Sequence, residues 1–480
     1  MLSDTVCQQA RLSRDPRFDG RFFIAVKTTR IYCRTICPAV APKESNVVYY
    51  ASAIEAANAG YRPCLRCRPD SAPNSPAWKG SSTTLERALR LIDDGELQSG
   101  SLSSLANRLG VSDRYLRSLF KQHLGVSPKS YALYQQCLFA KQLLHQTTLP
   151  ITQVALASGF NSVRRFNDCF RSALQLTPTE LRRAGKANKS GHSKGNSNGN
   201  NKARSSLKLK LYFRPPYDWT YVSQFLQRRA IDGLEWCGKN HYGRMIRWGD
   251  CEGQFTATYM GDKNRFDVEI ELNELRSVKQ LVNNIRRILD LDADIDAVDR
   301  HLQAQVGDSL RLSKGLRLPG IWDVFEAGVR AILGQQISVV AAHKLVSLLV
   351  ERLGNEVDGY YFFPKPEQIM NSSLDFFKMP GARKQTLNDF AAYFLSTSFH
   401  SNNDANPDEW IKIKGIGPWT INYAKFRGLS DPDIYLSGDV AVKKAMQLLL
   451  DDSRLRESFD PACVSPWRSY LTLHLWKQLL

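Results

Sequence analysis

The chain has 480 residues, 43% of them hydrophobic, and its 65 Lys and Arg against 47 Asp and Glu give a formal net charge of +18. At roughly 100–200 residues per domain, this length predicts about three domains and excludes a single small module. There is no apolar run near the roughly 18 residues of a membrane span and no signal-peptide core, so we expect a cytoplasmic protein without a membrane partner. Residues 1–206 hold 30 basic and 13 acidic side chains, whereas 207–480 hold 35 and 34. The charge therefore predicts a polyanionic partner that is held mainly by the N-terminal part.

Two polar segments divide the chain. Residues 72–82 are rich in Pro, Ser and Gly, and residues 185–206 form a basic tract with nothing to bury. In the first ordered piece we expect short strands at 22–26 and 47–50 and a helix near 52–59 that ends at Gly60. The predicted domains are 1–71, 83–184, 207–274 and 275–480, with 185–206 as a flexible linker.

The first piece contains two closely spaced cysteine pairs. Cys33 and Cys37 are separated by three residues, Cys64 and Cys67 by two, and 26 residues lie between the pairs. This spacing lets four thiolates converge tetrahedrally on one Zn²⁺. A closed zinc ribbon that only stabilises a small domain is the alternative to a reactive site.

The hydrophobic periodicity of the second piece predicts helices, and the piece contains an internal repeat. Ala106-x3-Gly110 is matched by Ala155-x3-Gly159 about fifty residues later. Each copy has a short helix, a glycine turn and a second helix, so the repeat predicts two helix-turn-helix units in tandem. Their second helices are expected at about 113–123 and 162–171. A plain helical bundle with solvated charges is the alternative.

The third piece begins with alternating segments at 207–214 and 266–272, which predict antiparallel strands, and is helical from about 277 onward. The predicted fold class is therefore multidomain α+β. It comprises a small zinc-bound α/β domain, an all-α tandem helix-turn-helix domain, and an antiparallel-sheet subdomain followed by an all-α domain.

The sequence around the four cysteines, 28–38 and 61–69, resembles the N-terminal domain of Ada-type DNA repair proteins. The resemblance implies that Cys33 irreversibly accepts a methyl group from a methylphosphotriester in DNA. A zinc-bound thiolate keeps lone pairs that can attack a methyl carbon. Neighbouring cations would hold the phosphate strand: Arg30, Arg34 and Arg66.

Residues 85–183 resemble the AraC-type DNA-binding domain, which follows the zinc domain in Ada-type regulators. The implied partners are promoter DNA and RNA polymerase, in a monomeric, nucleoid-associated regulator of bacterial type. Four arginines of the second helices are the candidate DNA contacts: Arg114, Arg117, Arg164 and Arg165. The Pro-Cys-His-Arg motif of the O6-methylguanine methyltransferase domain does not occur in the sequence, so that activity is not expected.

The stretch 413–420 carries Gly415 and Gly417, and Asp439 follows about twenty residues later. This pair of features resembles the helix-hairpin-helix DNA glycosylases, in which hairpin N–H groups bind a phosphate. Segments 214–219, 317–320, 328–336 and 466–470 narrow the resemblance to AlkA-type 3-methyladenine DNA glycosylase. The resemblance implies that Asp439 is the catalytic carboxylate. It also implies that the base pocket is lined by Trp419, Tyr423 and Trp467, and that the wedge that enters the duplex is Leu318.

Simpler explanations exist for these residues, since Asp439 could be only a helix N-cap and the tryptophans only core. Trp419 occupies the position of the lysine of bifunctional relatives, so hydrolysis without strand cleavage is implied. Beyond Cys251 the chain has only Cys463, so no iron–sulfur cluster is expected. Gly438 replaces a second aspartate of some relatives. The predicted function is DNA alkylation repair joined to an alkylation-responsive regulator. The alternatives are a transcription factor with an inactive glycosylase-like scaffold, or a zinc domain that only docks the glycosylase.

Overall fold

The computed structural model describes residues 3–14, 18, 21–35, 37, 39–64, 67, 69, 83–187, 205–397, 405–451 and 459–479. Arg66, one of the predicted phosphate contacts, lies outside them. The chain divides into two compact units, Met1–Ala203 with Glu274–Asn283, and Arg204–Asn273 with Asn284–Leu480. Within the described ranges, no helix is long and apolar enough to cross a membrane.

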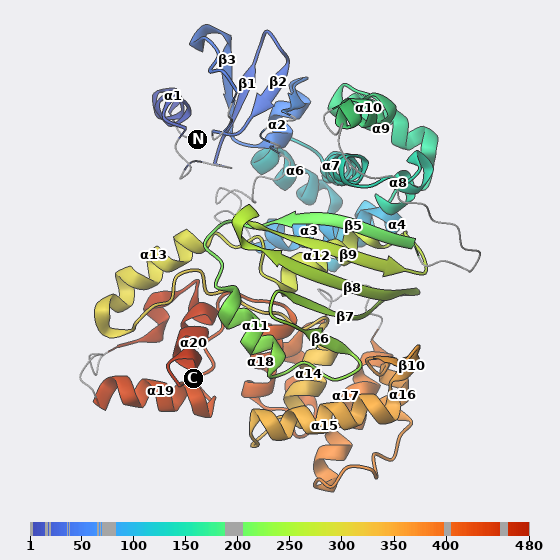
Figure 1. The fold of residues 1–480 in the computed structure, drawn as a ribbon, viewed down its shortest axis with the longest axis vertical. Coiled ribbons are helices and arrows are strands. Elements are labelled where there is room, and N and C mark those ends of the chain that lie inside the picture. The colour runs from blue at the N-terminus through green and yellow to red at the C-terminus, as the bar shows by residue number, and fades with distance from the viewer. Residues whose placement is uncertain are drawn as a thin grey trace. The chain divides into compact units, whose positions relative to one another are not determined.

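The first unit begins with a small sheet whose strand order is β3-β1-β2-β4 (Figure 1). Its elements are α1 (Asp4–Leu12), β1 (Phe23–Val26), β2 (Ile31–Cys33), η2 (Glu44–Asn46), β3 (Val47–Tyr50), α2 (Ala53–Asn58) and β4 (Arg62–Pro63). β1 pairs antiparallel with β2 and β3, and β4 pairs parallel with β2. Because side chains alternate along β1, Ile24 packs in one core with α1, and Phe23 and Ala25 pack in the other with Tyr32 and α2.

The rest of this unit is helical, as the repeat predicts. Its helices are α3 (Thr83–Asp93), α4 (Glu96–Ser99), α5 (Leu102–Arg108), α6 (Asp113–Leu124), α7 (Pro128–Gln146), α8 (Ile151–Ala157), α9 (Val163–Leu174) and α10 (Pro178–Ala187). The two turns are equivalent, since Gly110 and Gly159 have φ of 68° and 82°, a region that favours glycine. Ser112 and Ser162 cap α6 and α9 by accepting the backbone N–H three residues on.

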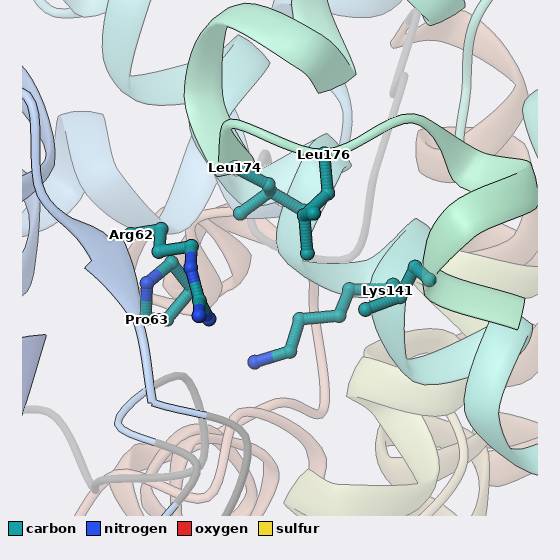
Figure 2. A pocket seen from close by; sticks show the side chains of 6 residues that line it. Arg62, Pro63, Lys141, Leu174 and Leu176 are labelled. Atoms are coloured by element: carbon teal, nitrogen blue, oxygen red, sulfur yellow. The ribbon is translucent and has the colours of Figure 1, made fainter. Parts of the chain in front are cut away.

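The zinc domain and the helix-turn-helix helices contact each other within this unit. The hydroxyl of Tyr32, the residue before Cys33, is hydrogen-bonded to the hydroxyl of Tyr134 on α7. Figure 2 shows the amine of the buried Lys141 directed into a small cavity nearby. Side chains from both parts line this cavity: Arg62, Pro63, Lys141, Leu174, Leu176 and Leu181. The end of β2 that carries Cys33 is thus tied to the helix that joins the two helix-turn-helix units.

The second unit contains a five-stranded antiparallel sheet in the order β5-β9-β8-β7-β6. Its strands are β5 (Ser205–Tyr212), β6 (Glu235–Cys237), β7 (His241–Trp248), β8 (Cys251–Met260) and β9 (Arg265–Leu272). Alternating residues of β5 and β9, such as Leu209 and Val268, are buried, which explains the alternation seen in the sequence.

Helices make up most of the remainder of the second unit (Figure 1). They are α11 (Trp219–Gln227), α12 (Val278–Ile288, which spans the division between the units), α13 (Ile295–Val306), α14 (Val324–Leu333), α15 (Val339–Leu353), α16 (Pro366–Met370), α17 (Gly381–Ser396), α18 (Pro418–Gly428), α19 (Val440–Asp451) and α20 (Arg468–Lys477). A short hairpin, β10 (Asn355–Val357) with β11 (Tyr360–Phe362), is an addition to the all-α expectation.

Two hydrophobic cores meet at α18. One comprises residues of α14, α15, α17 and the sheet, and the other comprises residues of α11, α13, α19 and α20. Ile421 and Ala424 belong to the first core and Phe426 to the second, while Tyr423 packs against both. The helix that follows the glycine hairpin is therefore held from two sides.

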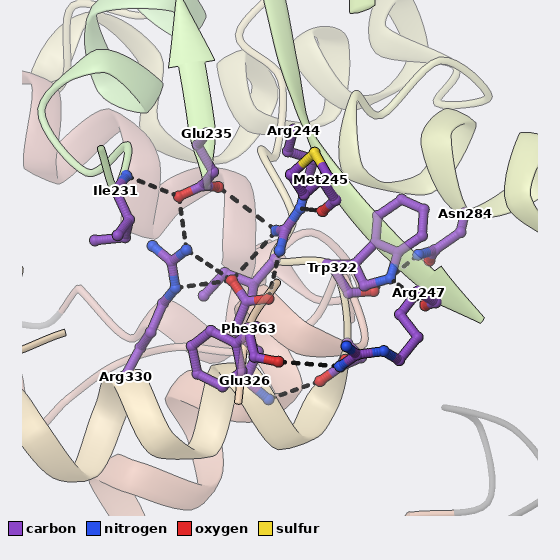
Figure 3. A network of polar contacts seen from close by, with 12 residues as sticks. Ile231, Glu235, Arg244, Met245, Arg247, Asn284, Trp322, Glu326, Arg330 and Phe363 are labelled. Atoms are coloured by element: carbon purple, nitrogen blue, oxygen red, sulfur yellow. Dashed lines mark hydrogen bonds and ion pairs between the residues drawn. The ribbon is translucent and has the colours of Figure 1, made fainter. Parts of the chain in front are cut away.

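A buried ionic network joins α14 to the sheet (Figure 3). The fully buried carboxylate of Glu326 accepts from Arg244 Nη2 at 2.7 Å and from Arg330 Nε at 2.9 Å. Arg330 Nη2 also lies 2.7 Å from Glu235. Burial opposes ionisation of Glu235, but the charges of Arg330 and Arg244 lower its pKa.

Candidate functional sites

The four cysteines of the two sequence pairs meet at one end of the small sheet. Their Sγ atoms all lie within 4.8 Å of one another, and Cys37 Sγ is 3.9 Å from Cys64 Sγ. A tetrahedral ion with Zn–S bonds of about 2.3 Å separates its sulfurs by about 3.8 Å. The cluster therefore fits Zn²⁺, and Cys33, Cys37, Cys64 and Cys67 form a zinc site.

The backbone also supports this cluster. The Arg34 N–H donates to Cys67 Sγ at 3.4 Å, and Arg34 Nη1 donates to the Cys67 carbonyl at 3.3 Å. The hydrogen bond with Cys37 raises the pKa of the Cys33 thiol. A bound divalent cation would displace the thiol protons and keep the sulfurs as thiolates.

A cavity of about 430 Å³ opens beside the zinc site. Its lining includes Cys33 and four cationic side chains: Arg11, Arg14, Arg34 and Arg62. Arg34 therefore lies where the sequence predicts it, whereas the Arg30 guanidinium stacks over the Tyr61 ring at 5.4 Å. Arg14 was not predicted, because it is 19 residues before Cys33 in the sequence and only folding brings it to this cavity.

The predicted arginines of the helix-turn-helix units are exposed. Arg114 and Arg117 lie on α6, and Arg164 and Arg165 lie on α9. The opposite faces of these helices are buried, through Phe120 in one copy and Phe170 in the other. Each second helix thus turns a basic face outward.

The glycine hairpin precedes α18. Gly415 has φ of 93°, and a Cβ there would lie 2.2 Å from Thr386 Oγ1, so this position requires glycine. A Cβ on Gly417 would meet nothing within 4 Å, so the hairpin is open on that side. Gln335 stabilises the turn by donating to the Gly415 carbonyl at 2.9 Å and to Thr420 Oγ1 at 3.0 Å. As at any helix N-terminus, the first N–H groups of α18 have no acceptor within the helix.

Asp439 stands at the start of α19, beside the indoles of two tryptophans. Its Oδ2 accepts from Trp419 Nε1 at 3.3 Å, and its Oδ1 accepts from Trp476 Nε1 at 3.0 Å. Oδ1 also accepts the backbone N–H of Ala441 and Val442. The N-cap role that the sequence left open is therefore real, and it coexists with an aromatic setting for the carboxylate.

The aromatic residues of the predicted pocket are half-buried. The Trp419 and Tyr423 rings stack at 5.2 Å between centroids with an angle of 28°. Trp467 makes an edge contact with Tyr470 at 6.1 Å. Gly438 lies against Trp419, since a Cβ there would be 3.7 Å from its Cβ and Cδ1.

The prediction that Leu318 is a wedge is wrong. Its side chain is 1% exposed and belongs to the core formed with α13, α19 and α20, and its N–H donates to Asp290 Oδ2 at 2.9 Å. A residue in that position cannot enter a duplex without unfolding the core. The exposed residues beside the hairpin are instead Gln336, with φ of 58°, and Ile337, which follow Gln335.

Comparisons with known proteins agree with this architecture. Residues 6–70 match the metal-binding domain of Ada, residues 105–184 a helix-turn-helix domain, and residues 208–323 the AlkA N-terminal domain. The chain is 33% identical over 186 residues to the bifunctional transcriptional activator/DNA repair enzyme Ada of Escherichia coli K12, covering 38% of this chain and 50% of that protein. It is 31% identical over 278 residues to DNA-3-methyladenine glycosylase 2 of the same organism, covering 55% of this chain and 95% of that protein.

One similarity spans both halves. The chain is 35% identical over 493 aligned residues to a probable bifunctional transcriptional activator/DNA repair enzyme AlkA of Mycobacterium tuberculosis, covering 98% of this chain and 96% of that protein. This chain therefore belongs to the family of AlkA-type bifunctional transcriptional activator/DNA repair enzymes.

Proposed function

We propose that the second unit is a monofunctional DNA glycosylase that releases alkylated purines such as 3-methyladenine and leaves an abasic site. The observation that carries the proposal is the carboxylate of Asp439, held between indole N–H groups beside the stacked Trp419 and Tyr423. Hydrolysis of an N-glycosidic bond develops positive charge on the sugar, and a fixed carboxylate stabilises it. The same carboxylate can orient the attacking water.

The aromatic rings suit a cationic base. An N-alkylated purine carries positive charge, so the faces of Trp419 and Tyr423 attract it and no strong general acid is needed. The bond from the sugar C1′ to the base nitrogen breaks and its electron pair leaves with the base, which becomes neutral. Water adds its hydroxyl to C1′, and its remaining proton passes to solvent. The hairpin at Gly415 to Gly417 would hold a backbone phosphate, while Gln336 or Ile337 would fill the space left by the extruded nucleotide.

For the first unit we propose methyl transfer from a DNA methylphosphotriester to Cys33. The Cys33 sulfur attacks the methyl carbon, the carbon–oxygen bond of the ester breaks, and the phosphodiester anion leaves. Bound zinc keeps the sulfur deprotonated at neutral pH. Arg14, Arg34 and Arg62 line the cavity beside Cys33 and supply the charge that would hold the DNA strand.

The transfer would also switch DNA binding by α6 and α9 at a promoter, and thereby transcription. A thioether carries one negative charge less than a thiolate, which reduces repulsion of phosphates at the zinc site. The contact of Tyr32 with Tyr134 supports a link from Cys33 to the DNA-binding helices. RNA polymerase is the partner that activation of transcription would require.

One experiment tests both chemistries. The full-length protein is incubated with methylated duplex DNA, released bases are analysed, and the protein is then digested and its cysteine peptides are weighed. We expect free 3-methyladenine, which the Asp439→Asn variant does not release, and one methyl group on the Cys33 peptide of both proteins. Absence of base release by the wild type would favour an inactive scaffold, and an unmethylated Cys33 would favour a docking role for the zinc domain.

A further inference from the structure

The zinc domain contacts the tandem helix-turn-helix domain through the two strands that lead into its zinc ligands. β2 ends in Cys33, and β4 comes directly before Cys64. Backbone hydrogen bonds join these strands, from Arg62 N to Arg30 O at 2.8 Å and from Cys64 N to Tyr32 O at 2.9 Å. β4 has two residues, and the second is a proline, which has no N–H group. Because so short a strand makes few ladder bonds, a zinc ion that links Cys33 to Cys64 would hold β4 in place.

The same two strands provide the contacts with the helices. The buried hydroxyl of Tyr32 on β2 is hydrogen-bonded to the hydroxyl of the buried Tyr134 on α7. Arg62 on β4 lines the small cavity of Figure 2 together with Leu174, the last residue of α9. Arg62 also lines the larger cavity beside the zinc site. The strands that zinc would fix are therefore the strands that contact α7 and α9.

A third contact joins α2 to the end of α6. Gly125 is the C-cap of α6, and a Cβ there would lie 3.3 Å from Glu55 Cγ on α2. We call the contacts of Tyr32, Arg62 and Glu55 with α6, α7 and α9 the domain interface. It involves the C-terminal ends of both second helices, whereas the exposed Arg114 and Arg164 lie in their first turns. The domain interface can therefore stabilise these helices without covering their candidate DNA contacts.

We infer that zinc binding stabilises the tandem helix-turn-helix domain through the domain interface, so that DNA binding by α6 and α9 depends on the state of the zinc site. Loss of zinc would release β2 and β4, and the bond between the hydroxyls of Tyr32 and Tyr134 would be lost with the apolar contacts of Leu174. The inference rests on the zinc site alone and holds whether or not the protein transfers methyl groups or releases bases.

Hydrogen exchange followed by mass spectrometry tests this on the full-length protein, with zinc and after its removal by a chelator. In the wild type, zinc removal should speed exchange roughly tenfold or more in peptides of α7 and of the last turns of α6 and α9. Peptides of α14, in the second unit, should not respond. Tyr134→Phe keeps the ring and removes the hydroxyl, and loss of one hydrogen bond should reduce the zinc effect on α7 by about fivefold.

Tyr131→Phe is the matched control. Tyr131 is buried one turn before Tyr134 on α7, and its ring packs against Phe120 of α6 within the helix-turn-helix domain. This variant should keep the full zinc effect. Tyr32→Phe removes the same bond from the zinc domain, so it should match Tyr134→Phe, and the double variant should lose no more than either single one. The zinc content of every variant should equal that of the wild type.

Three results would overturn the inference. In the first, exchange in α7 does not respond to zinc although peptides of the zinc domain do. In the second, Tyr134→Phe keeps the zinc effect of the wild type. In the third, Tyr131→Phe reduces the zinc effect as much as Tyr134→Phe, since α7 would then be loosened as a whole. None of these results bears on base release or methyl transfer, which are measured on methylated DNA.

Discussion

The buried network around Glu326 makes a quantitative prediction about the second unit. Two arginines and two glutamates balance one another there, and the Glu326 side chain has no exposed surface. The Glu326→Gln variant keeps the shape of the side chain but removes one negative charge. Glu235 is then the one carboxylate of this network that balances the charges of Arg244 and Arg330. Breaking a buried pair in this way costs about 3–5 kcal/mol. At roughly 2 °C per kcal/mol for a unit of this size, the thermal midpoint should fall by about 6–10 °C.

Tryptophan fluorescence can follow this unit selectively, because eight of the nine tryptophans of the chain lie between residues 219 and 476. The matched control is Glu269→Gln, which breaks an ion pair with Lys208 whose side chains are 56% and 74% exposed. Solvent screens that pair, so its loss should cost under about 1 kcal/mol. A shift for Glu326→Gln no larger than that of the control would refute the reasoning. Glu326→Gln combined with Arg244→Met should recover part of the loss.

Three further predictions concern protons and metal. Burial lowers the pKa of His474 to about 3, below its ordinary 6.5, so stability should be lost as pH falls from about 6.5 to 3. His474→Gln should flatten that dependence in urea unfolding, and an unchanged slope would contradict it. Burial raises the pKa of Asp290 to about 6, above 3.8, so its ionisation reduces stability as pH rises through this window. Asp290→Asn, which still accepts from Leu318 N and Tyr470 Oη, should gain up to about 3 kcal/mol at pH 8 and nothing at pH 4 in the same assay. Chelation of zinc should abolish methyl transfer to Cys33 while base release continues, and joint loss of both activities on methylated DNA would count against separate sites.

Much of this protein could be predicted from spacing along the chain. The cysteine pairs, the two glycine turns at Gly110 and Gly159, and the hairpin at Gly415 each depend on residues within a few positions of one another. Such features express local geometry, in which a glycine permits a positive φ or two thiols reach one ion. These local conformations depend little on the surrounding fold, so the sequence alone determined the domain types and the zinc ligands.

Tertiary packing decided the rest. Leu318 follows an arginine and precedes Pro-Gly, a setting that suggests an exposed loop, yet α13, α19 and α20 close over it. Arg14 reaches the zinc cavity from 19 positions before Cys33, and Trp476 reaches Asp439 from 37 positions away. No local preference encodes these contacts, because burial and long-range hydrogen bonds arise only when separate helices pack into one core. The sequence therefore predicted the candidate reacting groups, while the tertiary structure decided which side chains surround them.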